Sequence, residues 1–219
     1  MPGLSLGLCF SIIYIYKQTE PVMQVLAASV QSQIKSIIGD FNEVRLPALE
    51  QAWGRTVAEQ RQFWDHDQIS VEYSKNFSIP LNNCFFRAVN SQLPGFLEKT
   101  TRGSDYVYTD AQGVTDPIED KNAFNGTGQV WTGNGFGKCD WHLLKRFEVD
   151  PVTGRIVKCF VMLVNLSKTQ GAWGQKTVNG KTAQRVGLKF LVSDIDNIIV
   201  IHGTVIKKKK YLEFKVEPV

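Results

Sequence analysis

The first half of the chain has apolar residues at the spacing of amphipathic helices. Between Gln24 and Phe41 they recur at steps of three and four residues, which predicts a helix that Gly39 ends. A second helix is predicted over Pro47 to Asp65, and a shorter third one over Asn82 to Leu93. The predicted helices therefore come first in the chain.

Further along, the pattern changes to short runs of aromatic and β-branched residues separated by turn residues. The run Asp105 to Thr109 is followed by a turn candidate, Asp110 to Gly113, and the chain can return as a partner strand from Val114. This segment predicts an antiparallel hairpin.

A second hairpin is predicted after the first. Its strands are Trp141 to Val149 and Arg155 to Leu166, and Asp150 to Gly154 forms the turn. Further β-branched runs occupy residues 187–219, whereas the Gly- and Asn-rich stretch Asn122 to Gly137 is predicted to be a loop. Helices followed by a sheet of at least five strands define an α+β fold.

The composition is that of one soluble globular domain. The chain has 219 residues, of which 43% are hydrophobic and 21% charged, and its formal net charge is +4. This balance excludes a disordered polyelectrolyte, and the lack of a fixed sequence repeat excludes a fibrous or solenoid protein. The four cysteines are far apart and form no C-x-x-C pair, which argues against a zinc ribbon or a disulfide framework. Reduced thiols in a cytoplasmic protein are the favoured interpretation.

Residues 1–22 are interpreted as an apolar N-terminal extension, and residues 23–219 as a single domain. The apolar run over residues 4–16 is shorter than the roughly 20 residues that a membrane span needs. No basic residue precedes this run, which disfavours a secretory signal but leaves it as an alternative. We therefore expect no membrane partner.

Three polar residues on the first predicted hairpin are the main candidates for chemistry. Glu119 and Lys121 are two residues apart on the returning strand, so their side chains lie on the same face. Antiparallel pairing about the turn brings Asp105 opposite Ile118 and Glu119, close enough for two carboxylates to share one divalent cation. Lys121 would stand beside that cation and help to position or deprotonate a water molecule. Such a site suits hydrolysis of a phosphodiester bond.

Asp105, followed fourteen residues later by Glu119-x-Lys121, resembles the PD-(D/E)xK nuclease superfamily, and the single-domain size is similar to that of type II restriction endonucleases. The resemblance covers about twenty residues, and Ser104 stands where the family's proline would precede the aspartate. It implies a restriction-endonuclease-like fold with helices flanking a central mixed β-sheet. It also implies a Mg²⁺-dependent endodeoxyribonuclease that cuts double-stranded DNA as a homodimer. Asp105, Glu119 and Lys121 would be catalytic, with Asp105 and Glu119 as metal ligands.

A third acidic ligand is often supplied in this family by an N-terminal helix. Glu43, Glu50 and Glu59 are available, and Glu59, within the second predicted helix, is the residue we assign as a metal ligand. A solvated helical face is the alternative for each. Glu213-x-Lys215 also has the acidic-x-Lys spacing, but little of the sequence follows it to complete a fold around such a site.

Polar and basic residues after the motif are candidates for DNA contacts, because amides can read base edges and cationic side chains can bind phosphates. The predicted DNA-binding residues are Asn122, Asn125, Gln129, Asn134, Lys138, Lys145 and Arg146. The run Lys207 to Lys210 allows two interpretations: it neutralises phosphates, or it protects an edge strand from pairing with another chain.

A different class of protein also fits the sequence, namely a non-catalytic β-rich binding or assembly protein. In that protein Asp105, Glu119 and Lys121 would be ordinary surface groups on a hairpin. The nuclease hypothesis instead requires the ends of these three side chains to lie within several ångströms of one another.

Overall fold

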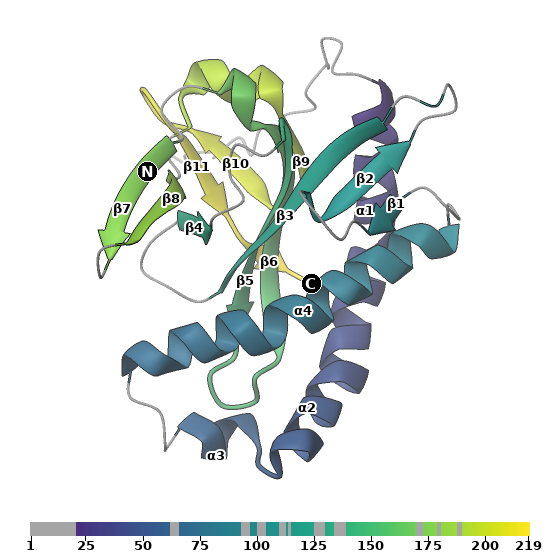
Figure 1. Ribbon diagram of the computed structural model, residues 1–219, viewed down its shortest axis with the longest axis vertical. Helices are drawn as coiled ribbons and strands as arrows, with labels where there is room; N and C mark the ends of the chain where they lie inside the picture. Colours follow the sequence, from purple (N-terminus) through teal and green to yellow (C-terminus); the bar gives the residue numbers. More distant parts are fainter. Residues whose placement is uncertain are drawn as a thin grey trace, which may run out of the picture.

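The computed structural model describes residues 21–61, 66–92, 97–99, 104–109, 113, 115–124, 130–133, 139–169, 173–178, 181–187 and 190–219. The helices lie beside a central mixed sheet (Figure 1), which confirms the predicted α+β class. None of the described helices is long and apolar enough to cross a membrane.

Among the described residues, five helical elements precede the first strand: α1 (Pro21–Asp40), the π-helical segment η1 (Phe41–Arg45), α2 (Leu46–Trp53), α3 (Val57–Arg61) and α4 (His66–Gln92). Two 3-10 helices, η2 (Leu166–Lys168) and η3 (Val192–Asn197), lie between later strands. The strands are β1 (Leu97–Lys99), β2 (Tyr106–Thr109), β3 (Thr115–Phe124), β4 (Val130–Gly133), β5 (Trp141–Val149), β6 (Ile156–Asn165), β7 (Trp173–Val178), β8 (Lys181–Gly187), β9 (Ile198–His202), β10 (Thr204–Lys207), β11 (Leu212–Lys215) and β12 (Glu217–Pro218).

Helix α1 forms where the apolar spacing predicts it, but it does not end at Gly39. Leu26 and Ile34, on its apolar stripe, are at most 3% exposed. The helical path runs on through η1 and α2, because Phe41 continues the buried stripe and its packing outweighs the low helix propensity of one glycine. Gly54 ends the path instead, with a left-handed φ of 63°.

The other predicted helices also differ in extent from the structure. α2 and α3 occupy the predicted second helix in two pieces, and residues 62–65 lie outside the described residues. α4 is 27 residues long and contains Pro80, whereas the sequence pattern predicts only its last part. Phe77 and Leu81 are fully buried on either side of Pro80, and this packing stabilises the longer helix despite the proline.

The large sheet contains both parallel and antiparallel pairs. Its strand order is β1-β2-β3-β5-β6-β12, and β9 also pairs with β6. β3 and β5 are parallel, and the other described pairs are antiparallel. The two predicted hairpins are confirmed as β2–β3 and β5–β6. At the turn of the second, the Asp150 carboxylate accepts hydrogen bonds of 2.8 Å from the N–H groups of Val152 and Thr153.

The segment that the sequence predicts as a loop, 122–137, is partly strand. β3 continues to Phe124 because it pairs with β5 along its whole second half. β4 pairs with β8, which pairs with β7, in a separate three-stranded antiparallel sheet. Residues 125–129 and 134–138 lie outside the described residues.

Both faces of the large sheet are covered. On the helix face, Ile118 and Leu143 belong to one buried cluster with residues of α1 and α4. On the opposite side, which we call the hairpin face, Leu144 and Met162 pack in a second cluster with Phe214 of the β10–β11 hairpin. Because side chains alternate along each strand, the position of a residue in β3 or β5 decides which face it serves.

Candidate functional site

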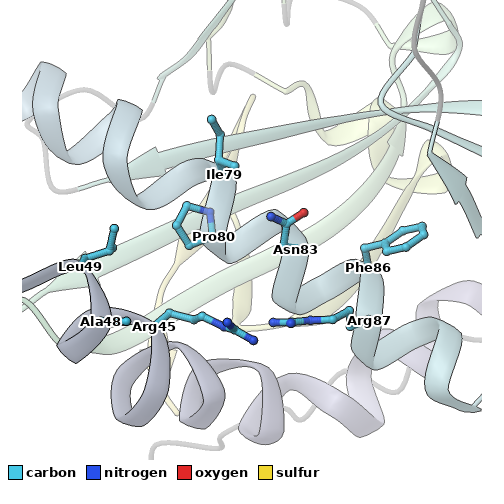
Figure 2. A pocket seen from close by; sticks show the side chains of 8 residues that line it. All are labelled: Arg45, Ala48, Leu49, Ile79, Pro80, Asn83, Phe86 and Arg87. Atoms are coloured by element: carbon cyan, nitrogen blue, oxygen red, sulfur yellow. The ribbon is translucent and has the colours of Figure 1, made fainter. Parts of the chain in front are cut away.

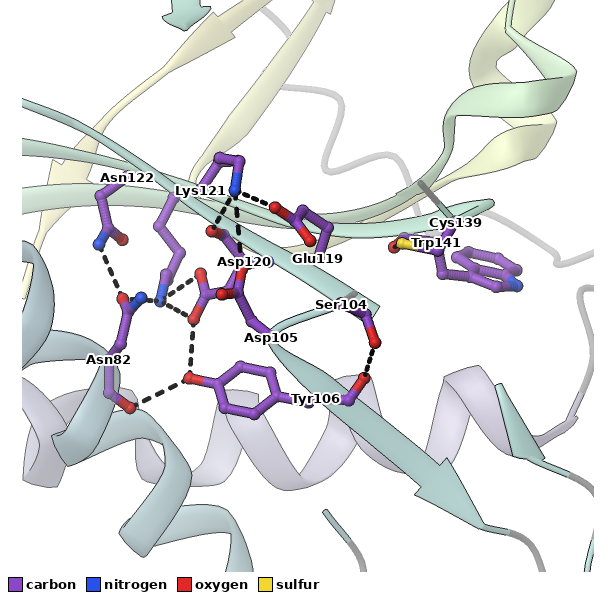
Figure 3. A network of polar contacts seen from close by, with 11 residues as sticks. Asn82, Ser104, Asp105, Tyr106, Glu119, Asp120, Lys121, Asn122, Cys139 and Trp141 are labelled. Atoms are coloured by element: carbon purple, nitrogen blue, oxygen red, sulfur yellow. Dashed lines mark hydrogen bonds and ion pairs between the residues drawn. The ribbon is translucent and has the colours of Figure 1, made fainter. Parts of the chain in front are cut away.

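Asp105, Glu119 and Lys121 are brought together on the hairpin face (Figure 3). Tyr106 lies opposite Ile118 in the β2–β3 register, so Asp105, the residue before β2, comes beside Glu119. Lys121 Nζ donates a hydrogen bond to Glu119 Oε1 and lies 3.6 Å from Asp105 Oδ2. The antiparallel hairpin therefore assembles the group that the sequence spacing predicts.

The backbone of β3 holds the Asp105 carboxylate in place. The N–H of Asp120 donates a hydrogen bond of 2.8 Å to Asp105 Oδ2. The carbonyl oxygen of Asp120 also accepts a long hydrogen bond, 3.4 Å, from Lys121 Nζ. Three oxygen atoms, from two carboxylates and one main-chain carbonyl, thus face the same ammonium group. The ammonium charge offsets the repulsion between the two carboxylates.

The three side chains differ in their exposure to solvent. The side chain of Glu119 is only 3% exposed, that of Lys121 is 18% exposed, and that of Asp105 is 43% exposed. Solvent therefore reaches the group from the Asp105 side. Glu119 lies in a region of lower dielectric constant, where its attraction to Lys121, or to another cation, is stronger than in water.

Carboxylate and carbonyl oxygens are the type of ligand that Mg²⁺ prefers. Mg²⁺ is usually bound through one or two protein carboxylates and keeps several of its waters, so Asp105, Glu119 and the Asp120 carbonyl are the groups that could hold it. Among the described residues, no group of three or more His, Cys, Asp or Glu side chains is placed to hold a metal ion. A third carboxylate ligand is therefore not supplied by this part of the chain.

Glu59, the predicted third ligand, caps its own helix instead. The Thr56 N–H and hydroxyl donate hydrogen bonds of 2.7 and 2.9 Å to Glu59 Oε2. These bonds, that from the backbone first, lower the pKa of the Glu59 carboxyl. α3 lies at the opposite end of the molecule from β2 (Figure 1). The assignment of Glu59 as a metal ligand is therefore corrected. Glu50 accepts a hydrogen bond from the Val57 N–H, and Glu43 forms an ion pair with Arg155 at the β5–β6 turn.

A second polar network lies beneath the site, on the helix face. Asp120 and Lys145 are fully buried, and their charged groups are 2.7 Å apart. The Tyr106 hydroxyl donates a hydrogen bond of 3.0 Å to Asp120 Oδ2, and Lys145 Nζ donates one of 3.0 Å to Asn82 Oδ1. Asn122 Nδ2 donates to the same Asn82 oxygen at 2.7 Å. The motif spacing does not reveal this network, which joins β2, β3 and β5 to α4 (Figure 3).

Burial changes the ionisation of this network. Desolvation raises the pKa of Asp120 and of the Tyr106 hydroxyl, and it lowers the pKa of Lys145. The attraction between Asp120 and Lys145 acts against both of their shifts. The short contact and the additional hydrogen bonds favour the ion pair.

Two predicted DNA contacts belong to this buried network. Lys145 is fully buried against Asp120, so its ammonium group cannot reach a phosphate. Asn122 is partly buried and bound to Asn82, on the side of the sheet opposite Lys121. Strand alternation is the physical reason, because both residues occupy helix-face positions. The DNA-contact assignment is corrected for both.

Arg146 is the predicted contact that lies on the hairpin face among the described residues. It follows Leu144, the β5 partner of Lys121, by two residues, so it points to the same side of the sheet. It is partly exposed. The other predicted contacts, Asn125, Gln129, Asn134 and Lys138, lie outside the described residues.

Two neutral groups border the buried carboxylate. His142 lies opposite Glu119 in the β3–β5 register and is fully buried, and this burial lowers its pKa to about 4. Burial, followed by the charge of Glu119, raises the pKa of the Cys139 thiol to about 11. Both side chains are therefore uncharged near neutral pH, which leaves Lys121 as the cation that contacts Glu119 in the described site.

A groove of about 490 Å³ lies apart from this site, between α2 and α4 (Figure 2). Pro80 and Phe86 contribute apolar surface to it, and Arg45 and Arg87 contribute charge. Both guanidinium groups contact Asp40 Oδ2, at 3.5 and 3.2 Å, so their charge is partly compensated. None of the residues that line this groove belongs to the candidate site.

Comparison of the chain with protein-family models found no match, and searches of curated proteins and of solved structures found none either. A functional interpretation therefore rests on the geometry and chemistry of the chain's own residues.

Proposed function

We propose that the chain is a Mg²⁺-dependent endodeoxyribonuclease of the PD-(D/E)xK type, with a restriction-endonuclease-like fold, that hydrolyses phosphodiester bonds in double-stranded DNA. The observation that carries this proposal is the convergence of the Asp105 and Glu119 carboxylates and the Asp120 carbonyl on Lys121 Nζ. A type II restriction endonuclease is the specific form of the proposal. The mixed sheet, with the motif on a hairpin next to a parallel strand, is compatible with it.

Each residue of the group has a role in this proposal. Asp105 and Glu119 would hold Mg²⁺, which would supply positive charge to stabilise the phosphate as the bond breaks. Lys121 would hydrogen-bond and orient the attacking water, because its ammonium group is already held beside both carboxylates. The hydrogen bond from the Asp120 N–H would keep the Asp105 carboxylate oriented towards the bound Mg²⁺.

Partial burial supports this division of roles. Glu119 is shielded from water, so a cation bound there interacts more strongly than one at the surface. Asp105 is the exposed member, on the side from which a phosphate can approach. Arg146, on the same face, would contribute positive charge near the DNA backbone.

A homodimer is part of the proposal. The two strands of a DNA duplex are antiparallel, so a pair of identical sites related by a two-fold axis can cut both strands in one complex. Sedimentation velocity with and without duplex DNA measures this directly. A monomer in both conditions would contradict this part of the proposal while leaving the hydrolysis untouched.

The decisive experiment compares two matched glutamate substitutions. Plasmid and phage DNA are incubated with the wild-type chain, with Glu119→Gln and with Glu59→Gln, each in Mg²⁺ and in EDTA. We expect discrete fragments from the wild type and from Glu59→Gln in Mg²⁺ alone. Glu119→Gln should leave the DNA intact, because it removes a metal ligand with little change in volume.

Other outcomes separate the parts of the proposal. A Mg²⁺-dependent smear that requires Glu119 would keep the nuclease and contradict the restriction role. Intact DNA from folded wild-type protein, over a broad set of unmethylated and methylated substrates, would contradict the nuclease and favour a binding protein. Loss of cleavage in Glu59→Gln, with its fold intact by circular dichroism, would contradict the assignment of the site.

A further inference from the structure

The hairpin of β10 and β11 carries a concentration of positive charge that the candidate site does not use. β10 ends with Lys207 opposite Leu212, and the turn between the strands is closed by a 2.8 Å hydrogen bond from the Lys208 N–H to the Tyr211 carbonyl. Lys207, Lys208, Lys209 and Lys210 are all exposed, and we call these four residues the lysine tip.

The lysine tip is held in a fixed position by residues 190–192, at the start of η3. The Val192 N–H donates a hydrogen bond of 3.2 Å to the Lys210 carbonyl, and the Leu212 N–H donates one of 2.9 Å to the Phe190 carbonyl. Leu191 and Tyr211, which lie between the residues that make these two bonds, pair as an isolated antiparallel β-bridge. The tip is therefore presented on an ordered support, and a partner that binds it does not have to order a loose segment.

Two of these four charges, those of Lys209 and Lys210, are not neutralised by an ion pair within the described part of the chain. Lys208 Nζ lies 3.0 Å from Glu213 Oε2, whereas Lys209 and Lys210 form no ion pair among the described residues. Adjacent ammonium groups repel one another, so this arrangement is unfavourable for the free protein and favourable for a bound polyanion. Protection of an edge strand does not explain it, because Lys208, Lys209 and Lys210 lie in the turn rather than along a strand.

The lysine tip belongs to the layer that covers the hairpin face. Leu212 and Phe214 of β11 pack in the same buried cluster as Leu144, which is the β5 partner of Lys121. The hairpin and the group around Lys121 are thus on one side of the large sheet. A long rigid polyanion that approaches this side can meet both.

We propose that the lysine tip is a second contact to duplex DNA, which binds backbone phosphates at a distance from the bond that is cut. This inference rests on the proposed function for its choice of polyanion. Lysine ammonium groups bind phosphate as point charges and need no base-specific geometry, so the contact adds affinity without sequence preference. Its signature is a strong dependence of binding on salt concentration.

The test measures binding without cleavage. The affinity of the full chain for a labelled DNA duplex is followed by fluorescence anisotropy in EDTA over a range of salt concentrations. The variant is Lys209→Gln/Lys210→Gln, and the control is Lys35→Gln/Arg55→Gln, which removes the same charge from exposed positions in the helical layer. We expect the slope of log K against log salt to become shallower by about 1.8 in the tip variant alone, because each phosphate that a lysine neutralises contributes about 0.9 to the slope.

The possible results separate this inference from the nuclease proposal. An unchanged slope in the tip variant, with DNA still cut by the wild type in Mg²⁺, would overturn the lysine tip as a DNA contact and leave the nuclease standing. A shallower slope in a protein that never cuts DNA would support the contact and overturn the nuclease. Equal changes in the tip variant and the control, or no binding by the wild type at low salt, would overturn the contact.

Discussion

The buried Lys145 ammonium group lies 2.7 Å from the Asp120 carboxylate, on the opposite side of β3 from Lys121. This ion pair determines which side chains of β3 lie on each face of the sheet. With Asp120 turned towards Lys145, Glu119 and Lys121 necessarily face the other side. A shift of β3 by one residue would place Glu119 and Lys121 against the helices and turn Asp120 away from Lys145.

The first prediction concerns the stability that this pair provides. Lys145→Met should lower the free energy of unfolding by about 3–5 kcal/mol, because it leaves the Asp120 carboxylate buried without its cation. The double variant Asp120→Asn/Lys145→Met should recover part of that loss, since no charge is then buried and the Tyr106 hydroxyl can still donate to the amide oxygen. Urea unfolding of the three proteins measures both effects. A loss below about 1 kcal/mol in Lys145→Met, the range of exposed pairs, would contradict the prediction.

This network also shows which parts of the site can be predicted from the sequence and which cannot. The two-residue spacing of Glu119 and Lys121 is sufficient to put them on one face. The same alternation requires the Asp120 side chain to lie on the opposite face, which is the helix face. The identity of its partner is not local information, because Lys145 meets it only through the parallel β3–β5 pairing. From the sequence alone Lys145 is therefore expected to be an exposed cation, and this is why it was wrongly predicted to bind DNA.

Glu59 and Gly39 show two other cases in which the local sequence does not determine the structure. The local pattern of Thr56 and Glu59 is that of a capping box, but a helical glutamate is also what a metal site would use, and only the long-range arrangement separates the two. Gly39 is a helix terminator by propensity, yet the buried residues that follow it keep the chain helical. Strand pairs joined by short turns were predictable because their constraints are local.

The second prediction concerns pH and His142. Its pKa in the folded protein is about 4, below the usual value of 6.5 that applies to the unfolded chain. Between these values the unfolded chain binds more protons, so the stability that neutral His142 provides is complete above pH 6.5 and is lost as the pH falls towards 4. We expect a loss on the order of 3 kcal/mol over this range.

Denaturant unfolding at pH 7 and at pH 4.5, in EDTA, measures this loss in the wild type and in His142→Gln. The variant cannot gain a proton at this position, so its stability should fall less between the two pH values. Equal losses in both proteins would show that acid destabilisation arises elsewhere, for example from carboxylates.

The third prediction separates capping from metal binding at the start of α3. Thr56→Ala removes the hydroxyl that accepts a hydrogen bond from the Glu59 N–H. It should lower the free energy of unfolding by about 1 kcal/mol. DNA cleavage by this variant should equal that of the wild type, because α3 lies far from the candidate site. Thermal unfolding and a plasmid cleavage assay measure the two effects. A loss of cleavage without a matching loss of folded protein would contradict the capping role.

The fourth prediction concerns Gly203, which joins β9 to the hairpin that carries the lysine tip. Its φ is 101°, and an added Cβ would lie 2.3 Å from the ring of Phe160 and 2.7 Å from the Lys215 carbonyl. Gly203→Ala should therefore lower the free energy of unfolding by about 3 kcal/mol or more, since it combines backbone strain with overpacking.

Gly54→Ala is the matched control for this substitution. Gly54 also has a positive φ, 63°, but an added Cβ would meet no atom within 4 Å, so only the backbone strain of about 1–2 kcal/mol applies. Urea unfolding of the two variants measures the difference between them. Equal losses would contradict the close packing of the β9–β10 corner on Phe160. A larger loss for Gly203→Ala would show that this contact fixes the hairpin over the sheet, and with it the position of the lysine tip.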